Sequence, residues 1–397
     1  MSNTQKKNVP ELRFPGFEGE WEEKKLGNLT TKIGSGKTPK GGSENYTNKG
    51  IPFLRSQNIR NGKLNLNDLV YISKDIDDEM KNSRTYYGDV LLNITGIVET
   101  HANLNQHVCI IRLKKEYYYN FFGQYLLSRK GKRKIFLAQS GGSREGLNFK
   151  EIANLKIFTP TIFEEQQKIG KFFSKLDRQI ELEEQKLELL QQQKKGYMQK
   201  IFSQELRFKD ENGEDYPDWE NSKIEKYLKE RNERSDKGQM LSVTINSGII
   251  KFSELDRKDN SSKDKSNYKV VRKNDIAYNS MRMWQGASGK SNYNGIVSPA
   301  YTVLYPTQNT SSLFIGYKFK THRMIHKFKI NSQGLTSDTW NLKYKQLKNI
   351  NIDIPVLEEQ EKIGDFFKKM DILISKQKMK IEILEKEKQS FLQKMFL

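Results

Sequence analysis

The sequence has little of what secreted and membrane proteins need. Cys109 is the only cysteine, so no disulfide can form within the chain. No stretch approaches the ~18 apolar residues that a membrane-spanning helix requires, and the opening MSNTQKKNVPELRF has no apolar run typical of a secretory signal. These absences predict a cytoplasmic protein, in which Cys109 is a buried small side chain.

Motifs for catalysis are also missing. GSGKT at 34–38 is not a P-loop, because Thr31 stands where a glycine is needed and Pro39 follows where a helix should begin. His322 and His326 have helical spacing, but no third metal ligand is evident. None of the nine prolines are adjacent, which excludes the Pro-Pro-aromatic motif of amino-group DNA methyltransferases. We therefore expect no catalytic residue, no metal site and no cofactor bound by this chain.

What the chain does have is a repeat. EEQQKIGKFF at 164–173 returns as EEQEKIGDFF at 358–367, and ELRF at 11–14 returns at 205–208, both after 194 residues. A duplicated chain is a pseudo-dimer, which suits a target that itself has two parts.

The repeated segments are predicted to be two long helices. Apolar residues follow a heptad pattern in 162–203 and again in 356–397, and about 40 residues make a helix of roughly 60 Å. The residues expected to pair the two helices are Ile169, Phe173, Leu176, Ile180, Leu187, Leu190, Ile363, Phe367, Met370, Ile374, Ile381 and Leu384.

An antiparallel coiled coil is the expected arrangement of the two helices. Polar residues interrupt each seam, and one register places Glu183 opposite Gln377, Lys194 opposite Phe367 and Lys388 opposite Phe173. The alternative is that each helix packs separately on its own domain.

Positive charge is concentrated outside the repeated helices. The net charge is +20; residues 1–161 have 26 basic and 16 acidic side chains, and 204–355 have 26 and 18. The segments 162–203 and 356–397 each carry only +1. Two basic globular blocks are expected of two surfaces that each bind a polyanion.

Both basic blocks are predicted to be mixed α and β, which makes the fold class α+β. Outside the opening phrase and the approach to each helix their sequences barely resemble each other, although GDVLLNITG at 88–96 faintly echoes NDIAYNSMR at 274–282. The predicted domains are 1–161, 162–203, 204–355 and 356–397. A fixed helical frame would thus hold two different recognition domains.

Candidate DNA-binding residues lie in polar, glycine-rich loops and basic runs, where arginine can read guanine and asparagine or glutamine can read adenine. The first block offers Ser35, Lys37, Thr38, Lys40, Arg55, Ser56, Asn58, Arg60, Lys132, Arg133, Ser143 and Arg144. The second block offers Arg231, Arg234, Ser280, Arg282, Trp284, Gln285, Thr336 and Ser337.

Over its whole length the chain resembles the specificity subunits of type I restriction-modification enzymes. The matching marks are the two helix starts at 160–173 and 355–367, and the LRF opening at 12–14 with Trp21. The opening returns as LRF at 206–208 with Trp219, which comes four residues late because of an insertion.

The resemblance implies that this chain is not itself an enzyme. It would read a bipartite, asymmetric site in double-stranded DNA and dock two adenine-methyltransferase subunits, and restriction subunits could join them. S-adenosylmethionine, ATP and Mg would then be bound by the partner subunits. Two readers on one face of a duplex need centres about 34–36 Å apart, a spacing that long helices can set. The alternative is a coiled-coil scaffold that binds nucleic acid without sequence specificity.

Overall fold

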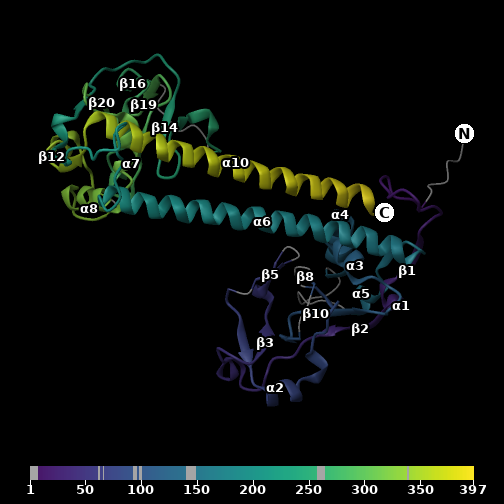
Figure 1. Cartoon of the computed structure of the whole chain (residues 1–397). Coiled ribbons are helices and arrows are strands. Elements are labelled where there is room, and N and C mark those ends of the chain that lie inside the picture. Colours follow the sequence, from purple (N-terminus) through teal and green to yellow (C-terminus); the bar gives the residue numbers. More distant parts are fainter. Residues whose placement is uncertain are drawn as a thin grey trace, which may run out of the picture. The chain divides into compact units, whose positions relative to one another are not determined.

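The computed structural model describes residues 8–60, 63–65, 67–92, 96–97, 101–139, 149–256, 264–337 and 339–397. The chain divides into two compact units: Met1–Gln185 with Met379–Leu397 form unit 1, and Lys186–Lys378 form unit 2 (Figure 1). Two long helices, α6 (Phe163–Phe202) and α10 (Leu357–Met395), contribute to both units. Among the described residues no helix is long and apolar enough to cross a membrane.

Unit 1 contains short strands and helices that precede α6. Its strands are β1 (Glu22–Lys25), β2 (Thr30–Ser35), β3 (Ile51–Leu54), β4 (Ile59–Arg60), β5 (Lys63–Leu64), β6 (Val70–Ile72), β7 (Val90–Leu92), β8 (Gly96–Ile97), β9 (Asn103–Leu104), β10 (Cys109–Leu113) and β11 (Lys156–Thr159). Its helices are α1 (Leu26–Leu29), α2 (Lys74–Glu79), α3 (Tyr119–Leu127), α4 (Arg129–Gln139) and α5 (Phe149–Asn154), with 3₁₀ turns η1 (Gly42–Asn45), η2 (Ser56–Asn58) and η3 (Lys81–Ser83).

Unit 2 has the same mixture of elements between α6 and α10. Its strands are β12 (Glu220–Lys223), β13 (Leu228–Glu230), β14 (Leu241–Thr244), β15 (Gly248–Lys251), β16 (Lys269–Val271), β17 (Ile276–Asn279), β18 (Ser288–Lys290), β19 (Gly295–Val297), β20 (Tyr301–Pro306) and β21 (Asn351–Ile354). Its helices are α7 (Ser312–Lys318), α8 (His322–Asn331) and α9 (Tyr344–Leu347), with 3₁₀ turns η4 (Ile224–Lys226), η5 (Phe252–Glu254) and η6 (Met283–Gln285).

The two units share a frame that their sequences barely reveal. Unit 1 has a two-stranded sheet β1-β11 and a four-stranded sheet β2-β10-β7-β8, and unit 2 has β12-β21 and β13-β20-β17-β18 in the corresponding order. The faint echo between 88–96 and 274–282 is therefore structural, because β7 and β17 occupy the same place in their sheets. The same turn precedes both strands: the Asp89 N–H donates to the Tyr86 carbonyl, and the Asp275 N–H to the Arg272 carbonyl, each at 3.0 Å.

The units differ in the strands that are added to this frame. Unit 1 adds a three-stranded sheet β6-β3-β9 and the hairpin β4-β5, whereas unit 2 adds the pairs β14-β15 and β16-β19. Sequence divergence between the blocks therefore includes a real difference in topology, confined to segments outside the common sheets.

Parts of α6 and α10 run antiparallel within each unit, as the heptad pattern predicts. In unit 1 the rings of Phe173 and Phe396 stack with centroids 5.8 Å apart. In unit 2 Phe202 and Phe367 stack at the same distance, 5.8 Å. The start of each helix thus meets the end of the other, and the pairs correspond through the 194-residue repeat.

The seam residues are mostly withdrawn from solvent. In unit 1 the buried members are Ile169, Phe173, Leu176, Ile180, Ile381 and Leu384. In unit 2 Ile363, Phe367 and Met370 are buried, and Leu187, Leu190 and Ile374 are half-buried.

Lys194 and Lys388 do not have the partners that the sequence suggested. Lys194 binds Asp371 at 2.6 Å rather than facing Phe367, and Lys388 binds Asp177 at 2.5 Å rather than facing Phe173. Each of these two lysines finds its partner four residues, about one turn, beyond the predicted phenylalanine. The carboxylate there offers a charge-assisted hydrogen bond that an aromatic ring cannot.

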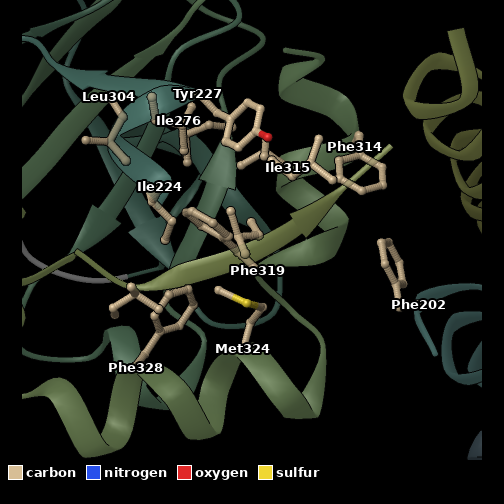
Figure 2. Packing of buried hydrophobic residues seen from close by; sticks show 14 of the residues in the cluster. Phe202, Ile224, Tyr227, Ile276, Leu304, Phe314, Ile315, Phe319, Met324 and Phe328 are labelled. Carbon is tan, nitrogen blue, oxygen red and sulfur yellow. The ribbon is translucent and has the colours of Figure 1, made fainter. Parts of the chain in front are cut away.

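The seam ends inside the hydrophobic core of each unit. Ile201, Phe202, Ile363 and Phe367 belong to the main core of unit 2. Figure 2 shows Phe202 with residues from the common sheet, among them Ile276 and Leu304. In unit 1 the corresponding core includes Ile169, Phe173, Met395 and Phe396. Each unit therefore includes parts of both helices in its own core.

The repeated LRF and EEQ motifs contact each other in a buried cluster of an arginine, a tryptophan and a glutamate, which we call the clasp. In unit 1 Arg13 donates to both carboxylate oxygens of Glu165 at 2.7 and 2.8 Å, and the Trp21 indole donates to the same carboxylate at 3.3 Å. Glu165 is fully buried. The clasp explains why the LRF phrase, the tryptophan and the EEQ phrase recur together.

Unit 2 contains the same clasp. Arg207 donates to Glu359 at 3.2 and 2.7 Å, and the Trp219 indole donates to it at 3.2 Å. The four-residue insertion before Trp219 leaves this geometry intact.

The next residue of the repeated phrase also has one role in both units. The Gln166 side chain donates to the Pro160 carbonyl and accepts from the Tyr118 N–H, both at 3.0 Å. Gln360 does the same with Pro355 and Ser311 at 2.8 and 2.9 Å. Each glutamine therefore ties the start of a long helix to the preceding strand and to the start of α3 or α7.

Candidate nucleic-acid interface

In unit 2 the structure brings two of the predicted DNA-binding segments together. The indole rings of Trp284 and Trp340 meet edge to face, with centroids 5.2 Å apart. The Leu342 N–H donates to the Ser280 carbonyl at 2.9 Å. The turn η6 and the loop before α9, which are about fifty residues apart in the chain, therefore form one surface.

The second of these segments is a closed loop. Gln333 and Asn341 exchange backbone hydrogen bonds of 3.0 and 2.8 Å. Gly334 has φ of 147°, where any Cβ would lie within 2.7 Å of the Thr339 backbone. Thr336 and Ser337 are exposed beyond this closure.

Hydrogen-bonding and apolar groups both reach solvent on this surface. Arg282 is exposed and donates to Gln285 at 3.3 Å, and the Trp284 indole donates to the Met281 carbonyl at 3.1 Å. Leu335 at the loop tip is fully exposed. Leu335 was not among the residues predicted from the sequence, although its place between Gly334 and Thr336 in a polar loop could have indicated it.

Three other predicted residues of unit 2 are engaged within the protein. Arg231 makes a two-pronged ion pair with Asp275, at 2.7 and 2.9 Å, and this hydrogen bonding raises the pKa of Arg231. Ser280 is buried and shares a 2.9 Å hydrogen bond with Thr302. Exposed Arg234 donates to Asn267 at 2.7 Å. To contact DNA, Arg231 would have to give up its carboxylate partner.

The Arg231 pair has a counterpart in unit 1 that sequence reasoning missed. Arg112 donates to both oxygens of Asp89 at 2.8 and 2.7 Å. The two aspartates occupy the same turn, before β7 and β17, but Arg112 lies on β10 whereas Arg231 follows β13. The same Arg–Asp ion pair is thus made by arginines from non-equivalent strands, so the 194-residue repeat does not relate the two arginines.

In unit 1 the glycine-rich loop is fixed to the sheet. The Lys37 N–H donates to the Leu104 carbonyl at 2.9 Å, and Thr38 accepts from the Asn105 side chain at 3.1 Å. Ser35 ends β2, and Lys37 and Lys40 are exposed. No helix follows directly, because η1 is a short 3₁₀ turn, so the backbone does not have P-loop geometry.

The segment after β3 joins this loop. The Asn105 N–H donates to the Leu54 carbonyl at 3.0 Å, which places η2 and the glycine-rich loop on the same strand end. Arg55 donates to the Asp68 carbonyl at 2.6 Å and lies over the Tyr46 ring at 5.8 Å. Its buried Nε has no hydrogen-bond partner among the described residues.

Asn58 holds this segment in shape. It is buried, its side chain accepts from the Arg55 N–H, and it donates to the Asn65 and Asp68 carbonyls. Ser56 is half-buried. Arg60 ends β4, and nothing is described of its side chain.

The remaining predictions in unit 1 lie elsewhere. Lys132 and Arg133 are exposed on α4, which packs against α3 and α5. Ser143 and Arg144, with the whole loop at 140–148, lie outside the described residues.

The single cysteine and the acidic and histidine side chains bear on the predictions about Cys109 and about metal binding. Cys109 is buried, and burial raises the pKa of its thiol to about 12. Across the described segments, no group of three or more His, Cys, Asp or Glu side chains is placed to hold a metal ion.

These observations define a class: a duplicated binding protein, with one frame used twice and different loops added to each copy. A family model described as the type I restriction modification DNA specificity domain matches residues 18–192 and 216–386, one match for each copy. The chain belongs to that family.

Curated relatives have matching names. The chain is 26% identical over 238 residues to a putative type I restriction enzyme MjaX specificity subunit from Methanocaldococcus jannaschii, covering 53% of each chain. It is 31% identical over 129 residues to the type I restriction enzyme EcoBI specificity subunit from Escherichia coli, covering 30% of this chain and 27% of that one. The alignments therefore span about half and about a quarter of these relatives.

Solved structures have the same fold over nearly the whole chain. The type I restriction-modification S subunit from M. genitalium superposes with a TM-score of 0.60 at 14% identity, covering 98% of this chain and 99% of that one. A chain from a study of complex assembly and conformational transition of the type I R-M system gives 0.53 at 16% identity, covering 94% and 97%.

Proposed function

We propose that this chain is the sequence-specific DNA-recognition subunit of a type I restriction-modification complex. The observation that carries the proposal is the pair of family matches, 18–192 and 216–386, one for each copy of the frame. Each unit would read one half of a bipartite site in double-stranded DNA. Because the added loops and strands differ, the two half-sites would differ in sequence.

In unit 2 the reading surface is η6 together with the loop closed by Gln333 and Asn341. Arg282 and Gln285 offer hydrogen bonds to base edges, and Leu335 offers an apolar contact such as a thymine methyl requires. In unit 1 the corresponding surface is the glycine-rich loop with the segment from Arg55 to Asn58. Exposed Lys132 and Arg133 suit phosphate contacts.

The chain would work without chemistry of its own. Two adenine-methyltransferase subunits would dock on it and supply the S-adenosylmethionine site. Restriction subunits that use ATP and Mg would join through them, in the cytoplasm. Leu189 in unit 2 and Ile383 in unit 1, both 54% exposed and related by the repeat, are candidates for the docking face. Phe172 and Phe366, another apolar pair related by the repeat, pack against the cores instead.

A binding experiment on the assembled complex tests this proposal. Arg282→Ala should weaken binding to the specific duplex by roughly 1–3 kcal/mol and relax preference at positions of one half-site only. The control is Arg272→Ala, an exposed arginine of the same unit that is paired with Glu233; it should leave the preference unchanged. Competition between unrelated duplexes, repeated at several salt concentrations, measures both quantities. Equal binding to all duplexes would instead indicate a scaffold without sequence specificity.

A further inference from the structure

Unit 2 contains a large groove between its part of α6, the turn after β14 and the junction of α7 with α8. It encloses about 1320 Å³. None of the residues predicted to read bases lines it. We call it the basic groove, because its charged lining includes Lys194, Lys195, Lys290, Lys318, Lys320 and Arg323.

The basic groove has almost no negative charge of its own. Among the described residues that line it, Asp371 is the only acidic one. That carboxylate already accepts from Lys194 at 2.6 Å and from the Tyr317 hydroxyl at 2.7 Å. Arg323 is also paired, with Asp353 at 3.0 Å. The excess of positive charge therefore comes from the four other lysines, within a concave surface where fields are stronger than on a flat one.

Two of the lysines are withdrawn from water. Lys318 is 2% exposed, with its ammonium 4.8 Å from the Trp219 ring and 5.3 Å from the Phe202 ring. Lys320 donates to the Ile245 carbonyl at 2.8 Å and to the Gly286 carbonyl. Burial lowers the pKa of both to about 8, since removing an ammonium from water disfavours its charged form. An anion in the groove would relieve this cost.

The start of α8 faces the same space. Thr321 caps this ten-residue helix by accepting from the Met324 N–H at 3.4 Å, and both Thr321 and His322 line the groove. The positive end of a helix dipole favours an anion.

Unit 1 has an equivalent groove, which provides an internal comparison. We call it the sister groove. Gln124 donates to Asp177 at 2.8 Å, as Tyr317 donates to Asp371, so these positions of the two grooves are equivalent. The sister groove is lined by four basic side chains but also by the acids Asp177, Glu184, Glu382 and Glu385.

The differences lie at the positions that make the basic groove positive. From the match of Tyr317 with Gln124, Lys318 corresponds to Tyr125 and Lys320 to Leu127. On the helices, the 194-residue repeat relates Gln191 to Glu385 and Lys195 to Gln389. The frame itself therefore does not need these lysines, because the other copy is built without them.

We propose that the basic groove of unit 2 is a binding site for phosphate groups. The structure offers ammonium groups, a helix start and enough room for a di- or triphosphate. The same chemistry would hold phosphates of a nucleic-acid backbone that enters the groove. The proposal does not depend on sequence-specific reading, since a chain without base preference could still bind phosphate here.

The test uses the full-length protein and isothermal titration with inorganic pyrophosphate, and separately with a short DNA duplex of mixed sequence. The double variant Gln191→Glu with Lys195→Gln installs the residues of the sister groove at two exposed helical positions, so the fold should persist; thermal unfolding checks this. We expect the affinity to fall about tenfold. The control Glu385→Gln, in the sister groove, should change nothing. Lys320→Leu, which copies Leu127, should reduce binding further.

Three outcomes are distinguishable. Pyrophosphate binding that weakens in the variants, with duplex binding unchanged, supports a free polyphosphate as the ligand. Duplex binding that weakens equally for all sequences supports a backbone phosphate. If the folded variants bind both probes as the wild type does, or if the wild type binds neither, the proposal is wrong. Under the first outcome, titration near pH 8.5 in two buffers of different ionisation enthalpy should also show proton uptake, because the bound anion raises the lysine pKa values.

Discussion

Unit 1 and unit 2 agree in their common frame and differ in the strands, loops and groove side chains that each unit adds to it. They share the clasp, the order of two sheets and the stacked phenylalanines at the helix ends. They differ in the added sheets, in the loops around η2 and η6, and in the charge of equivalent grooves. The shared features are therefore those that stabilise the common fold, and the differing ones are specific to each unit.

The clasp explains why the repeated LRF and EEQ motifs occur together in both units. A buried carboxylate is stable only if it is paired and hydrogen-bonded. Arginine and tryptophan from one phrase satisfy the glutamate of the other, so losing either phrase would leave a buried group without its partner. In their described residues, the loops contain no buried charge that depends on a residue of the repeated motifs, so their sequences can differ between the units.

Breaking the clasp should have the largest effect. Glu165→Ala leaves Arg13 and Trp21 without their partner and should destabilise unit 1 by about 3–5 kcal/mol, and Glu359→Ala should do the same to unit 2. Hydrogen exchange followed by mass spectrometry measures protection in each unit separately. Each variant serves as the control for the other. If Glu165→Ala lowered protection equally in both units, the clasp would not be local to its own copy.

The two copies of the repeated glycine should respond differently. A Cβ at Gly170 would lie 2.6 Å from the Tyr118 ring and 3.0 Å from the Phe121 nitrogen, whereas at Gly364 the nearest atom is a Leu313 side-chain carbon at 3.1 Å. Gly170→Ala should therefore cost about 1–3 kcal/mol.

Gly364→Ala should be near neutral, because a small shift of Leu313 is offset by the better helix propensity of alanine, worth up to ~1 kcal/mol. Denaturant unfolding of both variants measures the difference. Equal costs would show that the two helix starts are packed more alike than their contacts indicate.

The buried lysine of unit 2 should give that unit a pH dependence. Burial lowers the pKa of Lys318 to about 8, while nearby Asp353 favours the charged form and Arg323 and Lys327 oppose it. Between pH 8 and its unfolded pKa near 10.5, the folded state binds fewer protons than the unfolded state. This group therefore makes unit 2 more stable as pH rises through that window, by at most about 1.4 kcal/mol per pH unit.

Lys318→Met removes one of the two lysines of unit 2 whose pKa burial lowers to about 8, the other being Lys320, and should therefore reduce this rise. Lys132→Met, at an exposed position on α4 of unit 1, should leave it unchanged. Hydrogen exchange of unit 2 between pH 8 and 10, corrected for the intrinsic exchange rate, measures the slope. An identical slope in Lys318→Met would mean that other groups cause it.

The smallest effect is expected for an ion pair on the surface. Lys156 and Glu23 bridge β1 and β11 at 3.0 Å, with side chains 60% and 38% exposed. Lys156→Ala should change the stability of unit 1 by less than about 1 kcal/mol. A loss as large as that of the clasp variants, in the same unfolding assay, would contradict the distinction between buried frame and open surface.

Much of the frame could be predicted from the sequence. The heptads and the repeat predicted both long helices and their antiparallel pairing, because a periodic apolar stripe must be buried. The partners of Lys194 and Lys388 were wrong by about a turn, since the pattern of apolar residues does not show which carboxylate a lysine will reach. The repeat relates Asp177 to Asp371 in the sequence, but which lysine each carboxylate binds depends on how the two helices pack.

The interface was harder to predict for a physical reason. Arg231 and Arg282 are the same residue type in similarly polar surroundings, yet Arg231 is committed to Asp275 and Arg282 is exposed. Only the positions of neighbouring strands distinguish them. The basic groove was missed for the same reason, because its lysines come from α6, β18 and the α7–α8 junction.

Under the proposed function, one frame used twice carries two different DNA-reading domains. The most direct measurement is a genome-wide map of methylated adenines in cells that contain this chain with its methyltransferase subunits. We predict one motif made of two unlike half-sites separated by a constant number of unspecified base pairs. A palindromic motif, or methylation without any motif, would contradict it.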